Sequence, residues 1–211
     1  MQRLHTLAAL TFLTLLIPAA AASAAEQTLT LEPEATQVTF LLPATGHDVE
    51  GRLYLQSGEI AFDPATGAAW GEIRIDAVRA ETGSKKRDKK MHAKVLESAR
   101  FPSIVFVPER LEGELAASGS SDVELVGNVT IHGAAHPLTL PTRVVIDGGR
   151  ATAETTFKVP YVAWGMHDPS ILFLKVSQEV EVSIHAAGAV APTMAAAGST
   201  AAAVASAQGD R

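Results

Sequence analysis

Strict alternation between apolar and polar side chains is the feature of this sequence that most limits its fold. From Val123 to Ile131, apolar residues occupy every second position, with Gly127 in step with them. Because successive side chains of a β-strand point to opposite faces, this spacing predicts a strand with one buried face. Shorter runs of the same kind recur along the chain and end at turn signals such as Asp63–Gly67. Short strands separated by turns favour an antiparallel arrangement over alternating strands and helices.

The number of these runs predicts a closed barrel. About eight antiparallel strands are expected between residues 26 and 187, and eight strands are enough to close a sheet on itself. Closure removes the exposed strand edges through which sheets aggregate. We therefore predict an all-β fold, an antiparallel eight-stranded barrel. An outer-membrane barrel is the alternative, but its lipid-facing band requires aromatic girdles, and aromatic residues make up only 5% of this chain.

One basic segment interrupts the strands and is predicted to be a short helix. Residues Arg87–Glu97 suit a helix on which Met91 and Val95 lie four positions apart and turn one face inward. The pair Phe101-Pro102 ends this helix, because proline disfavours helical geometry in the preceding residue. The fold prediction therefore includes a short helix inserted before the Phe101-Pro102 strand, where it serves as a lid or plug.

Positive charge is concentrated in this segment, although the chain as a whole is acidic. The net charge of -6 gives no case for nucleic-acid binding, which requires a basic surplus. The local cluster is either an ordinary solvated helix face or an attractor for an anionic head group, with transient membrane-surface contact. Its members are Lys85, Lys86, Arg87, Lys89, Lys90 and Lys94.

Both ends of the chain differ in composition from the predicted barrel. Residues 1–25 combine a positive start at Arg3, the apolar run Leu7–Ile17 and the small residues Ala22-Ser23-Ala24. This pattern predicts a secretory signal peptide, cleaved after Ala24 or Ala25, and so a periplasmic or secreted protein. Residues 188–211 are rich in alanine and glycine and are predicted to be a disordered tail. The domain between them is expected at residues 26–187.

Several segments, taken in order, resemble the signature of the YceI-like family. They are Gly46–Gly51, Arg87-Asp88, Met91, Val95-Leu96, Arg100–Phe106, Gly127–Gly133 with His136–Leu140, and Val180–Ile184. Members of this family are secreted or periplasmic lipocalin-like barrels that bind polyisoprenoid or other long apolar molecules. The resemblance implies an exported soluble protein that holds a polyisoprenoid, quinone or similar amphiphilic lipid in a lipocalin-like barrel, with no other cofactor. Family members are often dimers, so a homodimer is a further expectation.

For ligand binding we single out apolar residues expected at the wall or mouth of a cavity. For each of them, packing in a filled core is the alternative. The candidates are Phe40, Met91, Phe101, Phe106, Phe157, Trp164, Leu172 and Phe173. The candidates for contact with a ligand head group are Arg87, Lys89 and Lys90.

Catalysis is not predicted. The sequence has no G-x-S-x-G motif and no cysteine, so no catalytic residue is assigned. Among the histidines, His132 and His136 are close together, but Gly133 and Pro137 indicate a turn rather than a helix that would align them on a metal. No metal site is predicted, and a metal-dependent hydrolase stays a minor alternative. The main alternative is a ligand-free interaction or stress-response module that docks through the basic helix Lys85–Lys94.

Overall fold

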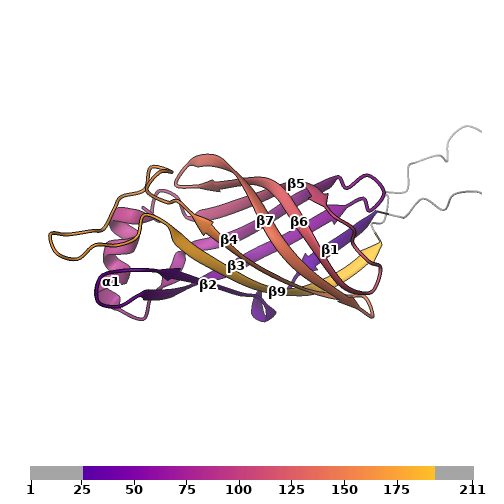
Figure 1. Cartoon of the computed structure of the whole chain (residues 1–211), viewed down its shortest axis with the longest axis horizontal. Helices are drawn as coiled ribbons and strands as arrows, with labels where there is room; N and C mark the ends of the chain where they lie inside the picture. The colour runs from indigo at the N-terminus through magenta and orange to yellow at the C-terminus, as the bar shows by residue number, and fades with distance from the viewer. Residues whose placement is uncertain (1–25, 193–211) are drawn as a thin grey trace, which may run out of the picture.

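The computed structural model describes residues 26–192 and shows a closed antiparallel β-barrel (Figure 1). Its strands are β1 (Gln27–Leu31), β2 (Gln37–Leu42), β3 (Val49–Phe62), β4 (Ala69–Glu81), β5 (Ser103–Glu112), β6 (Gly119–Ile131), β7 (Ala134–Asp147), β8 (Arg150–Val159) and β9 (Val180–Pro192). Both β1 and β2 pair with β3 on one side and β9 on the other, so they form one barrel strand interrupted by the 3₁₀ turn Pro33–Ala35. Pairing of β3 with β4 closes the ring. The predicted all-β fold with eight antiparallel barrel strands is confirmed.

The pair β6–β7 shows how the alternation fixes the register. The two strands pair without a break from Gly119↔Ile146 to Ile131↔Ala134, and every second residue of β6 from Ser121 to Val129 is buried. Their connection is the two-residue turn His132-Gly133, whose φ angles of 51° and 80° are both positive. Turns of this kind match the twist of the flanking strands. The register therefore keeps the apolar side chains on the inner face and residues such as Glu124 on the exposed outer face.

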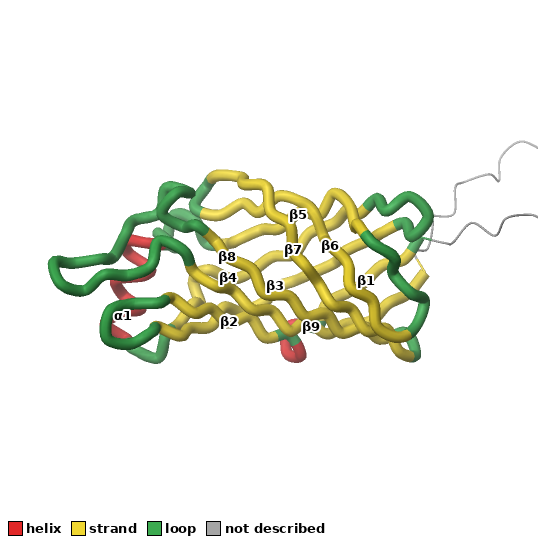
Figure 2. The backbone as a smooth tube through the Cα atoms, in the orientation of Figure 1, coloured by secondary structure: helices red, strands yellow, loops and turns green. Residues whose placement is uncertain are grey.

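The two ends of the barrel are built differently (Figure 1). One end, here called the mouth, carries α1 (Lys85–Lys90), the π-helical turn η2 (Met91–Val95) that continues it, and the loop 160–179. The other end, here called the terminal end, is where the described chain begins and finishes. Figure 2 shows α1 in red and the longest green loop together at the mouth. The predicted helix is present, and its bounds are shifted toward the N-terminus.

The sequence prediction of a tail from residue 188 is wrong for residues 188–192. These residues extend β9, and Gly188 to Pro192 pair with β1. A Cβ atom at Gly188 would lie 2.2 Å from the Thr30 carbonyl oxygen, so glycine is needed there for close approach of two strands. The remaining predicted tail and the predicted signal peptide at 1–25 lie outside the described residues. Within residues 26–192, no helix has the length and apolar character needed to span a bilayer.

Candidate functional site

The mouth half of the barrel encloses a cavity of about 420 Å³, a volume typical of small-molecule binding sites. Every strand from β2 to β9 contributes side chains to its wall. Met91, Val95 and Leu96 close it on the helical side, and Trp164 and Met166 of the loop 160–179 close it on the other. The helix and the loop therefore complete a chamber that the strands alone would leave open.

The strands make this wall apolar throughout. Every wall residue that a strand contributes is valine, leucine, isoleucine or phenylalanine. On β5 and β6, Phe106 lies opposite Val129 in the register, and Ile131 continues the same inner face toward the mouth. The period of two in the sequence thus becomes a continuous apolar surface inside the barrel.

Polar and charged groups of the cavity come only from segments at the mouth. Thr45 and His47 belong to the connection between β2 and β3, and Thr82, Arg87 and Lys90 belong to the connection that contains α1. Tyr161 belongs to the loop that follows β8. The cavity is therefore polar at its entrance and apolar within.

Arg87 is held at this entrance by Thr82. Its Nε donates to Thr82 Oγ1 at 2.7 Å, and its terminal nitrogen donates to the Thr82 carbonyl oxygen at 2.7 Å. The carboxylate of Asp88 accepts from the backbone N–H of Thr82 at 2.8 Å and from the Thr82 hydroxyl at 2.5 Å. Asp88 therefore fixes the residue that orients Arg87. These contacts use two of the five N–H donors of the guanidinium group.

The loop 160–179 is fastened to the rest of the mouth. Lys90 Nζ donates to the Pro169 carbonyl oxygen at 3.2 Å, and the backbone N–H of Thr45 donates to the Lys175 carbonyl oxygen at 2.8 Å. At the base of the loop, the Tyr161 hydroxyl donates to the Ser177 carbonyl oxygen at 2.7 Å. Burial raises the pKa of Tyr161 to about 12, with the negative charge of Asp168 as a smaller cause. The phenol therefore remains a protonated donor at neutral pH.

Comparison with known proteins identifies the barrel. A family model described as the YceI-like domain matches residues 29–187. The chain belongs to the YceI-like family. A UPF0312 protein of Shewanella sp. (strain ANA-3) is 30% identical over 145 residues, which cover 67% of this chain and 73% of the relative. A UPF0312 protein of Shewanella baltica (strain OS155) is 29% identical over the same shares of the two chains.

Two solved structures have the same fold as this YceI-like chain. Burkholderia cenocepacia BcnA matches with a TM-score of 0.60 and 21% identity, over 75% of this chain and 99% of BcnA. A polyisoprenoid binding domain from Saccharophagus degradans matches with a TM-score of 0.61 and 16% identity, over 76% and 98% of the two chains. At these identities the likeness is one of fold.

Five of the eight apolar residues predicted for ligand binding line the cavity of this YceI-like barrel: Phe40, Met91, Phe106, Phe157 and Trp164. The three phenylalanines project inward from strands, and Met91 projects from η2. The Trp164 indole stacks on the His136 ring, with centroids 4.3 Å apart and planes at 4°. Contact between these side chains and a ligand stays a prediction.

Leu172 and Phe173, which were predicted for the wall or mouth of the cavity, do not line it and lie at the tip of the mouth loop. They are 85% and 89% exposed. The flanking residues Ile171 and Leu174 exchange backbone hydrogen bonds of 3.0 and 2.6 Å. This tight turn keeps Ile171 and Leu174 at the cavity and leaves the two central side chains in solvent.

Phe101 and Lys89 also lie outside the cavity lining, and their contact with a ligand stays a prediction. The Phe101 ring packs beside the β6–β7 turn, 4.7 Å from the His132 ring between centroids, and the Arg100 guanidinium lies 4.8 Å from its centroid. Lys89 is exposed on α1, whereas Arg87 and Lys90 both reach the lining. Successive helical residues point in different directions, so three neighbouring basic residues cannot all face one entrance.

Sequence reasoning missed two groups of lining residues. The aliphatic wall, including Leu53, Ile75 and Leu140, was indicated in principle by the strand alternation, which marks every second residue. Thr82 and Tyr161 carried no such signal, because their positions depend on how the mouth segments fold over the barrel.

The histidines make separate contacts. His132 Nε2 lies 3.3 Å from Glu97 Oε1, while His136 stacks on Trp164. His92 bridges the Ser98 hydroxyl and the Ala80 carbonyl oxygen, each at 2.9 Å, and so ties η2 to β4. In the described part of the chain, no group of three or more His, Cys, Asp or Glu side chains is arranged to hold a metal ion.

Proposed function

We propose that this YceI-like chain is an exported binding protein that holds an amphiphilic lipid, of the polyisoprenoid or quinone type, in its barrel cavity. The observation that supports this is the division of the lining into apolar strand residues within and polar groups at the entrance. An amphiphile fits that division with its hydrocarbon part inside and its polar head at Arg87 and Lys90.

Burial of the hydrocarbon supplies the affinity in this proposal. Each buried CH₂ group contributes about 0.8 kcal/mol, so a long tail offers far more gross free energy than a few hydrogen bonds. The cost of ordering the tail and of association removes much of that gain. The polar groups at the mouth therefore need only orient the head group. Arg87 does this with the guanidinium N–H donors that do not bond to Thr82.

The comparisons support binding rather than catalysis. One protein with the same fold is named as a polyisoprenoid binding domain, and the family model covers the whole described barrel except its outermost residues. A carrier also needs no reactive side chain inside the cavity, in agreement with a strand wall of hydrocarbon side chains.

Native mass spectrometry and lipid extraction of the purified chain test the proposal. We expect a co-purifying lipid, or uptake of an added prenol or quinone in a one-to-one ratio. Ile131→Trp would place a larger side chain in the cavity and should weaken binding of an apolar fluorescent probe about tenfold or more. Val145→Trp on the outer face of β7 is the matched control and should bind as the native chain does. Equal probe binding by both variants would overturn the proposal.

Export and assembly are separate parts of the proposal. Mass spectrometry of protein recovered from the producing cell should give a mature chain that begins after Ala24 or Ala25, in the periplasm or the medium. Uncleaved protein in the cytoplasm would contradict export. A homodimer stays a prediction, for which light scattering of the mature chain is the measurement.

A further inference from the structure

The tip of the loop 160–179 exposes two large apolar side chains that the cavity does not use. Leu172 and Phe173 are the most exposed large hydrophobic residues of the described chain, at 85% and 89%. In Figure 1 the loop, drawn in orange, extends beyond α1 and is the outermost part of the mouth. Single exposed apolar residues are common, but two adjacent ones at the outermost point of a molecule form a local apolar protrusion.

This protrusion is presented by an ordered loop. Its base is held by the isolated bridge between Ala44 and Val176 and by the hydrogen bond from Lys90 Nζ to Pro169. The Ser170 hydroxyl accepts from the backbone N–H of Val176 at 3.0 Å. Contacts on both sides of the tip therefore fix its direction, away from the barrel.

Basic side chains accompany the tip. The hydrogen bond from Lys90 to Pro169 places α1 directly beside the loop. Exposed lysines on or next to the tip, α1 and η2 are Lys85, Lys86, Lys89, Lys90, Lys94 and Lys175. The acidic residues beside these lysines are Asp88, whose carboxylate is directed at Thr82, and Asp168 of the loop, which lies near Lys175. The chain is acidic overall, so this is a local surplus of positive charge.

We propose that the mouth docks on an anionic phospholipid bilayer, with Leu172 and Phe173 inserted among the lipids and the lysines over the phosphate groups. Stable attachment to a bilayer takes two signals, and an apolar anchor with a basic patch supplies both. A protein partner fits less well, because a stable protein interface needs roughly 1,000 Å² of complementary surface and this protrusion is convex and small. Docking would turn the cavity entrance toward the membrane. It goes beyond the proposed function and does not require an occupied cavity.

A single-site fluorophore tests insertion directly. The chain contains no cysteine, so Phe173→Cys and Val145→Cys each offer one labelling site. With vesicles of phosphatidylcholine and phosphatidylglycerol, an environment-sensitive dye at position 173 should shift to shorter wavelength, and the dye at 145 should not. The site-specific signal separates the tip from any attachment through residues 1–25. Absence of a shift at 173, or equal shifts at both sites, would overturn the proposal.

Vesicle sedimentation measures the two contributions separately. L172S/F173S should weaken binding to anionic vesicles about tenfold or more, while V107S/V145S, two exposed valines of the barrel wall, should not. K85Q/K86Q/K89Q should weaken binding by on the order of a hundredfold, since each charge near the surface counts for about fivefold. R74Q/R110Q/R143Q removes the same charge from the wall and is the matched control. Equal losses in target and control variants would contradict docking through the mouth.

The two proposals fail independently. Binding of an apolar probe by L172S/F173S should match the native chain, because neither side chain lines the cavity. Loss of vesicle binding with retained probe binding supports docking. Native vesicle binding by L172S/F173S overturns docking and leaves the carrier proposal intact. Capture of the mouth by a protein, with no preference for anionic vesicles, would also overturn it.

Discussion

The mouth and the terminal end of the barrel share the same strands but differ in what they enclose. The mouth half holds a cavity of about 420 Å³ with a polar entrance, whereas the terminal half holds one of about 100 Å³ that is lined by apolar side chains and by Thr36, Thr142 and Thr155. Val38, Ile73 and Ile75 contribute to both chambers. The alternation of the strands therefore makes most of the interior apolar, and the segments that cover each end determine how much of it stays open.

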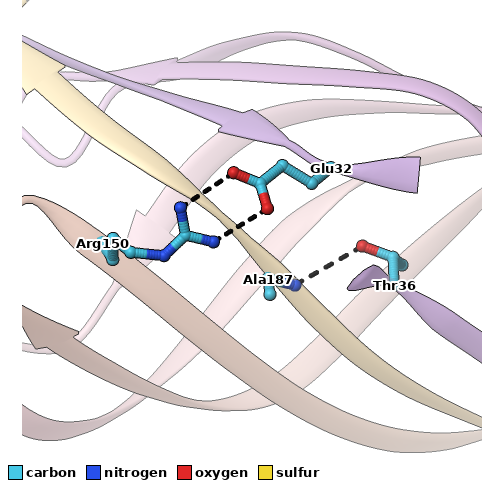
Figure 3. A network of polar contacts seen from close by, with 4 residues as sticks. All are labelled: Glu32, Thr36, Arg150 and Ala187. Carbon is cyan, nitrogen blue, oxygen red and sulfur yellow. Dashed lines mark hydrogen bonds and ion pairs between the residues drawn. The ribbon is translucent and has the colours of Figure 1, made fainter. Parts of the chain in front are cut away.

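The wall of the terminal half is also tied together across strands (Figure 3). Arg150 at the start of β8 donates to both carboxylate oxygens of Glu32, at 2.9 and 2.8 Å. The backbone N–H of Glu32 donates to the Ala187 carbonyl oxygen at 2.8 Å, and Thr36 accepts from the backbone N–H of Ala187 at 3.4 Å. These contacts span the place where β1 and β2 are interrupted. We therefore propose different roles for the two ends: the terminal end stabilises the fold, and the mouth admits the ligand of the proposed function.

The same substitution at the two ends should separate these roles most strongly. Phe62 at the terminal end is 5% exposed and packs in a core cluster with Ile60 and Leu125. Phe62→Ala should lower the free energy of unfolding by about 3–5 kcal/mol. Phe157 borders the open cavity, so Phe157→Ala removes fewer contacts and should cost only about 1–2 kcal/mol. The measurement is urea unfolding of each variant. Unchanged m-values would show that the substitutions alter the free energy of unfolding and not the surface exposed on unfolding.

The same two substitutions should also differ in their effect on ligand binding. Phe157→Ala should weaken binding of an apolar probe, whereas the fraction of Phe62→Ala that is folded should bind as the native chain does. A larger loss of stability for Phe157→Ala than for Phe62→Ala would contradict the assignment of roles to the two ends.

Two glycines give the next largest contrast. A Cβ at Gly188 would meet the Thr30 backbone oxygen at 2.2 Å, so Gly188→Ala must separate β9 from β1. We expect a loss of about 2–3 kcal/mol and faster hydrogen exchange in β1. Gly46 at the mouth has a φ of +97° but nothing within 4 Å of an added Cβ. Gly46→Ala should therefore cost only about 1 kcal/mol, from backbone strain alone, without faster exchange in β1.

A third prediction concerns Tyr161 at the base of the mouth loop. Its folded-state pKa of about 12 exceeds the ordinary value of 10.0. The unfolded chain therefore releases this proton first, and stability is complete below pH 10 and falls as pH rises toward 12. The slope is at most about 1.4 kcal/mol per pH unit for one proton. Tyr161→Phe should remove that slope and cost about 1 kcal/mol at neutral pH through the lost hydrogen bond to Ser177.

The pKa of Tyr161 can be measured in a Tyr54→Phe background by its absorbance. The chain has two tyrosines, so Tyr161 is then the only source of tyrosinate absorbance. Titration of the folded and urea-unfolded forms gives the two pKa values directly. Equal values in both forms would show that burial does not hold the proton on Tyr161.

Sequence patterns predicted those parts of this molecule that depend on local geometry. The alternation from Val123 to Ile131 predicted a strand with one buried face, and the spacing of four predicted that Met91 and Val95 turn one face inward, where both line the cavity. These inferences need only the direction of a side chain relative to its own backbone. The closed barrel followed because antiparallel strands of this number have few other ways to bury one face.

Other parts depended on contacts between distant segments and could not be predicted in this way. Leu172 and Phe173 point outward because Ile171 pairs with Leu174, and no periodicity marks that turn. Gly188 belongs to a strand because Thr30 lies against it, although its neighbours have the composition of a tail. Apolar character alone does not separate a cavity wall from an exposed tip, and that difference separates the proposed carrier site from the proposed membrane contact.

The smallest expected effect concerns the ion pair of the terminal half. The hydrogen bonds that Glu32 accepts from Arg150 hold the pKa of the Glu32 carboxyl below its ordinary value of 4.5. Its stabilising contribution is therefore present above that value and is lost as pH falls through the lowered folded-state pKa. Glu32→Gln should lower the melting temperature slightly at neutral pH and not at all in strong acid, because exposed ion pairs contribute little. Glu34→Gln, an exposed neighbour in the same 3₁₀ turn, is the control.

A double-mutant cycle decides whether the pair acts as a unit. If Glu32 and Arg150 stabilise the wall mainly through each other, Arg150→Gln should cost as much as Glu32→Gln, and the double variant should cost no more than either. Additive losses would mean that each side chain acts through other neighbours. In that case the backbone hydrogen bond between Glu32 and Ala187, which both substitutions leave in place, would be what joins β1 and β2 to β9 at the interruption.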